Sequence, residues 1–78
     1  MSIESVLQVE HPKAMRYYRE LKPVNNNAAL RMNSYANYLQ KMVYDIHHSD
    51  KDSDIEHYYK EIDITVKKIE DTYRKEVI

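Results

Sequence analysis

The sequence predicts an all-α fold: a helical hairpin of two long antiparallel helices, with a short or kinked N-terminal helix, that closes a bundle as a dimer. Two observations support this prediction. Apolar residues recur at alternating spacings of three and four along residues 26–47 and 54–77, as they do where one helix packs lengthwise against another. Residues 48–52 form a polar connection between these segments, with the usual length for a turn between antiparallel helices.

The C-terminal segment, residues 54–77, has the clearest helical pattern. Ser53 is placed to cap its first turn, and Glu56 three residues later completes a capping box. No glycine or proline interrupts the segment. Its apolar residues are spaced by 4, 3, 4, 3, 4 and 4 positions: Ile55, Tyr59, Ile62, Val66, Ile69, Tyr73 and Val77. We expect this row, called the seam, to lie in the core or in a dimer contact.

The segment before it, residues 26–47, is predicted to form the other helix of the hairpin. Its apolar stripe comprises Ala28, Met32, Tyr35, Ala36, Leu39, Met42, Val43 and Ile46. Within this stripe, Met32, Tyr35, Leu39, Met42 and Ile46 repeat at 3, 4, 3 and 4 positions and form a second seam. Leu39, Met42 and Ile46 are therefore candidates for the core or for a dimer contact.

The N-terminal segment, residues 1–21, completes the single domain of residues 1–78. Ser2 is a candidate cap for a first helix that ends near Glu10. Pro12 disfavours a helical conformation at His11 but suits the first turn of a second helix that ends at Leu21. The apolar faces of the two pieces align, so one helix kinked at Pro12 and two short helices both remain open.

The chain is short, which favours self-association. It has 78 residues and no cysteine, so disulfides and thiolate metal sites cannot stabilise a small core. Burying an aliphatic side chain contributes about 1.5–3 kcal/mol, whereas ordering each residue costs about 1–2 kcal/mol of backbone entropy. A homodimer would bury more apolar surface, including a strip beside the seams. This strip contains Tyr38, Met42, Tyr58, Thr65 and Thr72.

The net charge of -1 gives no general attraction to nucleic acid or to an anionic membrane. The charge is uneven: residues 1–44 carry six basic and three acidic side chains, and residues 45–78 carry six basic and ten acidic ones. The two parts would attract each other within the fold; the alternative is a basic patch for an acidic partner. No apolar run is long enough to span a membrane and no signal peptide is evident, so we expect a cytoplasmic protein.

The acidic turn resembles a calcium loop in spacing only. Asp50, Asp52 and Asp54 alternate and Glu61 stands where a twelfth ligand would be, but Ile55 occupies the position that needs glycine. His57 and Glu61 are four residues apart, and His47 and His48 lie nearby, without cysteine or an HExxH pattern. We therefore expect no metal site and no cofactor.

No grouping of residues indicates an enzyme. Glycine-rich phosphate loops are excluded because the chain has no glycine. The serines do not lie in any recognisable arrangement with histidine and an acid: Ser5, Ser34, Ser49 and Ser53. A small helical hairpin also offers little concave surface for a substrate. The expected function is non-enzymatic.

Nucleic-acid binding is an alternative. Residues 13–40 could form a helix-turn-helix-like segment whose second helix is rich in asparagine and carries Arg31, and both residue types read base edges. Against this alternative, the turn contains Pro23 and no glycine, the second helix is long, and basic residues are few. This reading would make the protein a DNA-binding transcriptional regulator.

Tyrosine is the strongest bias in composition: there are eight, with no phenylalanine or tryptophan. Tyr18, Tyr35, Tyr59 and Tyr73 fall on the apolar faces and fit core or dimer contacts. Tyrosines close to arginines are also typical of protein-binding surfaces. The candidate partner-binding residues are Arg16, Tyr17, Arg19, Tyr38, Tyr44 and Tyr58.

Together these features predict a small protein–protein interaction module. We expect a regulator or inhibitor that covers a functional surface of a host or partner protein. A composition rich in lysine, asparagine, isoleucine and tyrosine is typical of an AT-rich genome, such as that of a phage or another mobile element. A third reading is a structural assembly subunit.

Overall fold

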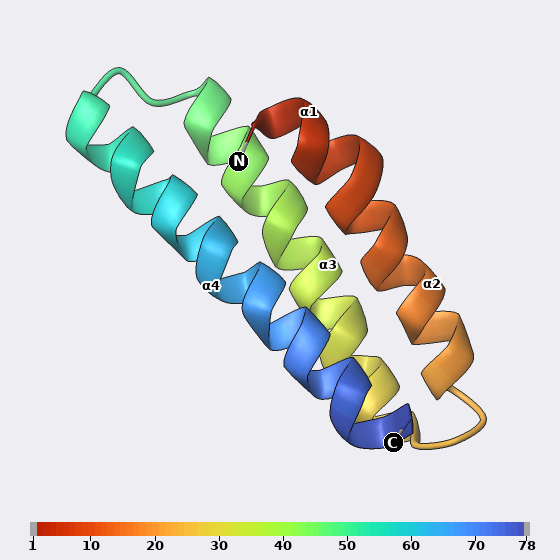
Figure 1. Ribbon diagram of the computed structural model, residues 1–78. Coiled ribbons are helices and arrows are strands. Elements are labelled where there is room, and N and C mark those ends of the chain that lie inside the picture. The colour runs from red at the N-terminus through yellow and green to blue at the C-terminus, as the bar shows by residue number, and fades with distance from the viewer. Residues whose placement is uncertain (1, 78) are drawn as a thin grey trace.

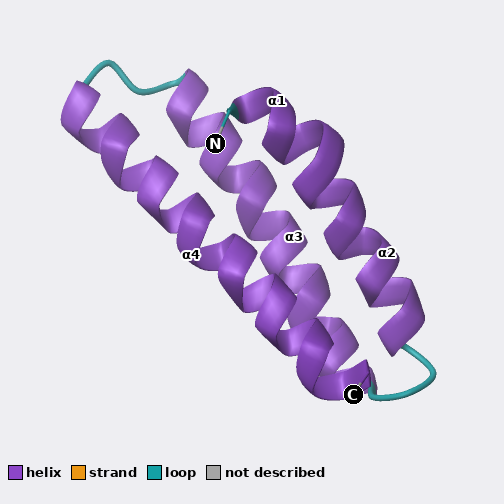
Figure 2. Ribbon diagram, viewed as in Figure 1, coloured by secondary structure: helices purple, strands orange, loops and turns teal. Residues whose placement is uncertain are grey.

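The computed structural model describes residues 2–77, which fold into a bundle of three antiparallel helical segments (Figure 1). The first consists of α1 (Ile3–Ser5), a π-helical stretch (Val6–Glu10) and α2 (His11–Leu21); α3 (Asn26–His47) and α4 (Asp52–Val77) follow. No strand is present in residues 2–77 (Figure 2), which confirms the all-α prediction. The predicted dimer involves a second chain and stays a prediction.

The N-terminal segment is one continuous helix that widens just before Pro12. Proline has no N–H, and its ring would collide with the carbonyl four residues earlier in a regular α-helix. Here the His11 N–H donates to the carbonyl of Val6, five residues back, which is the π-helical pattern. The wider turns carry the helix past Pro12 without a break, so two separate helices are not formed. Ser2 caps the start, since its side chain accepts from the Ser5 N–H at 3.1 Å.

The turn before α3 is ordered by Asn25. Its side-chain oxygen accepts a hydrogen bond from the Ala28 N–H at 3.2 Å, which caps the helix. Its side-chain nitrogen donates to Glu76 Oε2 at 3.1 Å. One residue thus begins α3 and also ties this end of the bundle to the last turn of α4.

The start of α4 differs from the sequence prediction. The helix begins at Asp52, two residues early, so Ser53 lies inside the first turn and the predicted capping box is wrong. Asp52 and Asp54 place negative charge in that turn, where the N-terminal end of the helix dipole favours it. Ser49 accepts from the Lys51 N–H at 3.4 Å and helps to order the preceding turn.

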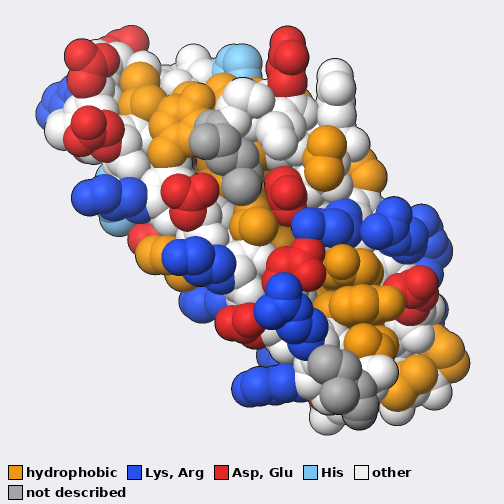
Figure 3. Space-filling model, viewed as in Figure 1, with side chains coloured by type: hydrophobic (Ala, Val, Ile, Leu, Met, Phe, Trp, Pro, Cys, Tyr) orange, Lys and Arg blue, Asp and Glu red, His pale blue; other side chains and the backbone are white. Residues whose placement is uncertain are grey.

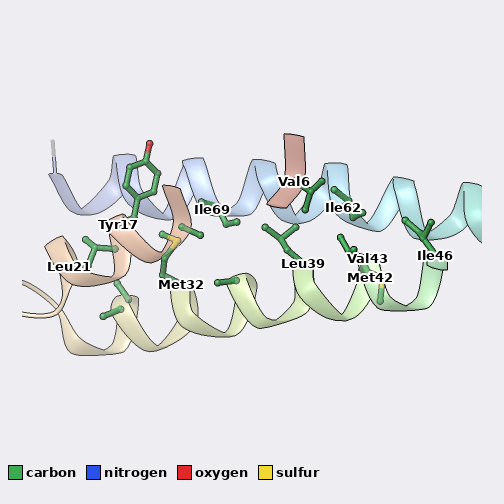
Figure 4. Close-up of a cluster of buried hydrophobic side chains, with 14 residues drawn as sticks. Val6, Tyr17, Leu21, Met32, Leu39, Met42, Val43, Ile46, Ile62 and Ile69 are labelled. Atoms are coloured by element: carbon green, nitrogen blue, oxygen red, sulfur yellow. The ribbon is translucent and has the colours of Figure 1, made fainter. Parts of the chain in front are cut away.

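α3 is the central helix. It packs against both α2 and α4, while α2 and α4 touch over a shorter stretch. Figure 4 shows Leu39 of α3 pointing toward α4 within the buried cluster. Among the seam residues, these are buried: Leu39, Met42, Ile46, Ile62 and Ile69. Met32 is buried as well. The following are half-buried and pack against the core: Tyr35, Ile55, Tyr59, Val66 and Tyr73. Val77 is 50% exposed, because it lies in the last turn of α4, so its predicted place in the core is wrong for a single chain.

α2 and α4 meet through stacked rings and paired charges. The rings of Tyr17 and Tyr73 are 3.7 Å apart between centroids, with 10° between their planes. The Tyr73 hydroxyl donates to Glu20 Oε2 at 2.7 Å, and this bond is the main reason that the pKa of Tyr73 is raised. Lys13 pairs with both Glu10 and Glu70, and the bond to Glu70 is the largest cause of its raised pKa. Opposite charges from the two parts of the chain therefore attract each other within the fold.

Candidate functional site

A groove of about 300 Å³ runs between α3 and α4. We call it the α3–α4 groove. No residue of the N-terminal segment lines it, so its walls belong to the hairpin of α3 and α4 alone. Its lining residues are Ser34, Tyr35, Tyr38, Glu61, Thr65 and Lys68.

Each wall follows a regular stripe along its helix. The α3 stripe repeats at 4, 3, 4 and 3 positions and consists of Arg31, Tyr35, Tyr38, Met42 and Asp45. The α4 stripe repeats at 4, 3, 4, 3 and 4 positions and consists of Asp54, Tyr58, Glu61, Thr65, Lys68 and Thr72. Such spacings keep side chains on one side of a helix. The groove lies at the middle of the two stripes, since Tyr35, Tyr38, Glu61, Thr65 and Lys68 line it.

One hydrogen bond sets the register of the two stripes. The Tyr38 hydroxyl donates to Glu61 Oε2 at 3.3 Å across the groove. Since α3 and α4 are antiparallel and each residue rises about 1.5 Å, this contact puts Arg31 level with Lys68 and Asp45 level with Asp54. Beyond the groove lining, the two stripes therefore end in basic side chains on one side and in acidic side chains on the other, with about 21 Å between the ends. Lys41, which is exposed, lies four residues before Asp45 and outside both stripes.

The space-filling view shows the same order of charges along α4, from acidic to basic. Figure 3 shows acidic side chains gathered at the end of the molecule where α4 begins, and lysine and arginine side chains more numerous toward its C-terminal half. The exposed charges that border the groove follow this order, since Arg31 and Lys68 are exposed at one end and Asp54 at the other. Asp45, at the acidic end, is half-buried.

The centre of the groove is polar. Burial raises the pKa of Tyr38, and the nearby charges of Glu61 and Asp45 raise it further, so its hydroxyl is a neutral donor at neutral pH. Thr65 is buried, and its hydroxyl donates to the Glu61 carbonyl at 2.7 Å. His57 Nε2 lies 3.9 Å from Glu61 Oε1 and attracts it only when protonated.

The six candidate partner-binding residues do not come together. Tyr38 and Tyr58 are half-buried and lie on the two groove stripes. Arg16 and Arg19 are exposed on α2. The side chain of Tyr44 is 62% exposed, and its ring stacks on His48 with 4.0 Å between centroids.

Tyr17 is used inside the bundle. Only 9% of it is exposed, it stacks on Tyr73, and its hydroxyl donates to Glu70 Oε1 at 3.4 Å. A partner could not reach this ring without displacing α4, so Tyr17 is not carried into the functional proposal. From the sequence, Tyr17 was indistinguishable from a surface tyrosine, because its stacking partner is 56 positions away.

Sequence reasoning missed the charged ends of the groove. Arg31, Lys68 and Asp45 were not among the partner-binding candidates, and Arg31 entered only the DNA-binding alternative, although they continue the three-and-four spacing of Tyr38 and Tyr58. The spacing alone was the available signal. It became meaningful only when the contact between Tyr38 and Glu61 fixed which residues face each other.

The geometry also bears on two other kinds of site, a metal site and a helix-turn-helix. Within residues 2–77, no group of three or more metal-binding side chains converges. The acidic residues Asp52 and Asp54 belong to α4 and not to a loop. α2 and α3 lie antiparallel and side by side (Figure 1), whereas the helices of a helix-turn-helix cross at about 90–120°.

None of the helices in residues 2–77 has both the length and the apolar character that crossing a membrane requires. Comparison of the chain with protein-family models, with curated proteins and with solved structures gave no match.

Proposed function

We propose that this chain is a non-enzymatic protein–protein interaction module that binds a protein surface in the α3–α4 groove. The observation that carries the proposal is the groove itself, which the half-buried Tyr35 and Tyr38 line together with Glu61 and Lys68. The half-buried Tyr58 and the charged ends of the two stripes continue this surface beyond the groove. Tyrosine is enriched at interfaces because it combines a large apolar ring with a polar tip and loses little side-chain entropy on binding.

The proposed mechanism is steric. A protein seated in the groove would have the facing part of its own surface covered, which is how a small regulator or inhibitor works without chemistry. The exposed Arg16 and Arg19 offer further contacts outside the groove. The proposal also includes a cytoplasmic location, which rests on the lack of a long apolar run in the sequence, and a phage or mobile-element source, which rests on composition alone.

A photo-crosslinking experiment tests the groove directly. A photoreactive phenylalanine analogue replaces Tyr38 in one variant and Tyr44 in a matched control, since Tyr44 is an exposed tyrosine of the same helix outside the groove lining. Both variants are irradiated in a lysate that contains this chain and, separately, as purified protein. We expect a covalent product with a protein from position 38 and little from position 44.

The same experiment has two contradicting outcomes. Absence of a protein product from position 38 in both samples would overturn the proposal. A product from position 44 alone would place the binding surface elsewhere. A DNA shift assay with the unmodified chain is run alongside, and tight sequence-selective binding there would favour the DNA-binding regulator instead.

A further inference from the structure

We infer that the partner that fits the α3–α4 groove is a second copy of this chain, placed against the first by a two-fold axis perpendicular to the helices. This inference rests on the proposed function, since it takes the groove as a protein-binding surface and names its occupant. It is carried by the order of the charges along the groove and by their distance from its midpoint.

The charges at the two ends complement each other. Arg31 and Lys68 form the basic end, and Asp45 and Asp54 form the acidic end. A two-fold axis reverses the direction of the groove in the second copy, so the basic end of each copy faces the acidic end of the other. Both contacts form at once, because the symmetry makes them identical.

The spacing of the charges fits this arrangement. Tyr38 and Glu61, which contact each other, lie seven residues from the charged position at either end of their stripes. The axis therefore passes close to them, with each charged end about 10 Å away. The ends are about 21 Å apart, beyond the Debye length of about 8 Å at physiological salt, so each end recognises its own counterpart.

A partner with charge of one sign fits less well. A nucleic acid or a strongly acidic peptide would pair with the basic end but would meet Asp45 and Asp54 at the other end. A second copy satisfies both ends and also covers the half-buried tyrosines between them. Ile64 lies on α4 between Glu61 and Lys68 and is 46% exposed, so it adds an apolar contact at the rim.

The experiment uses charge reversal in the full chain. One variant reverses the basic end (Arg31→Glu with Lys68→Glu), and the other reverses the acidic end (Asp45→Lys with Asp54→Lys). Each variant alone brings like charges together at both contacts, so we expect self-association to weaken about tenfold or more. Mixed in equal amounts, the two variants restore opposite charges at both contacts and are expected to form a heterodimer. Sedimentation equilibrium measures each mass.

A third variant controls for net charge. Lys60→Glu with Lys67→Glu makes the same change in net charge as the basic-end reversal, at exposed residues of α4 outside both stripes. It is expected to dimerise like the unmodified chain. Circular dichroism checks that all the variants keep their helices.

Three results would overturn the inference. These are a monomeric unmodified chain at tens of micromolar, reversed variants that dimerise as well as the control, and reversed variants that stay monomeric when mixed. In each case a crosslink from position 38 to another protein in the lysate would leave the proposed function standing. Absence of any protein crosslink from that position would overturn both the proposed function and this inference.

Discussion

Tyr17 and Tyr73 stack with 3.7 Å between their ring centroids and join α2 to α4 across 56 positions of the chain. This is a principal contact between two helices that otherwise meet mainly through α3. The hydroxyls of both rings donate to carboxylates, Tyr17 to Glu70 and Tyr73 to Glu20. The stacked pair therefore positions α2 against α4.

The first prediction concerns this stacked pair. Tyr17→Ala and Tyr73→Ala, separately and together, should give a coupling free energy of about 0.5–1.5 kcal/mol, because stacked aromatic rings interact beyond the area that they bury. Urea unfolding of the four proteins in the cycle measures this coupling. A matched cycle with Tyr44 in place of Tyr73 should give a value close to zero. Equal coupling in both cycles would contradict the packing of α2 on α4.

The second prediction concerns the core. Leu39 and Ile62 are fully buried, so Leu39→Ala or Ile62→Ala should lower the free energy of unfolding by about 2–5 kcal/mol. Leu30 and Val77, on the same two helices, are 53% and 50% exposed and serve as matched controls. Their replacement by alanine should cost far less. Chemical denaturation measures these losses. Similar losses at buried and exposed positions would mean that the core-facing side of each helix is wrongly assigned.

Much of this core was predictable from the sequence, because the spacing of apolar residues within one helix is a local property of the chain. The spacing of Leu39, Met42 and Ile46 determines which side of a helix is apolar, whatever it packs against. The end of the turn before α4 was less predictable, since Asp52 and Ser53 both suit a helix start and differ little in free energy.

The groove was only partly predictable, because the sequence of one helix does not determine which residues of another helix lie opposite it. Tyr38 and Tyr58 were candidates by composition and position. That Arg31 lies level with Lys68 depends on the contact between Tyr38 and Glu61, which are 23 positions apart. For the same reason the sequence predicts a surface position for Tyr17, and only its contact with Tyr73 places it inside the bundle.

The third prediction is a loss of stability at alkaline pH. Lys13, Tyr38 and Tyr73 all have a pKa raised above the ordinary values of 10.5 for lysine and 10.0 for tyrosine. A group whose pKa is higher in the folded state stabilises the fold fully below its unfolded pKa and loses that contribution as pH rises through its folded pKa. Stability should therefore fall from about pH 10 upward.

Tyr73→Phe provides the comparison for the alkaline prediction. This variant keeps the stacked ring but removes the hydroxyl that donates to Glu20, so its stability should fall less steeply above pH 10 than that of the unmodified chain. Urea unfolding at several pH values measures both slopes. An identical slope in the two proteins would contradict the role of this hydrogen bond.

The fourth prediction concerns Glu61, which lies close to the inferred two-fold axis. In a dimer its carboxylate would approach that of the second copy, and like charges that are close together repel. Glu61→Gln should therefore tighten self-association while keeping an acceptor for the Tyr38 hydroxyl. Glu56→Gln, on the exposed side of α4, is the control and should leave association unchanged. Weaker association of the Glu61 variant in sedimentation experiments would contradict the position of the axis.

The central claim is that the α3–α4 groove binds a second copy of this chain, and sedimentation equilibrium of the unmodified protein tests it most directly. The chain has a mass of 9.4 kDa, so the account predicts twice that mass at tens of micromolar, with association that weakens as salt screens the charged ends. A single-chain mass throughout that concentration range at low salt would contradict the claim.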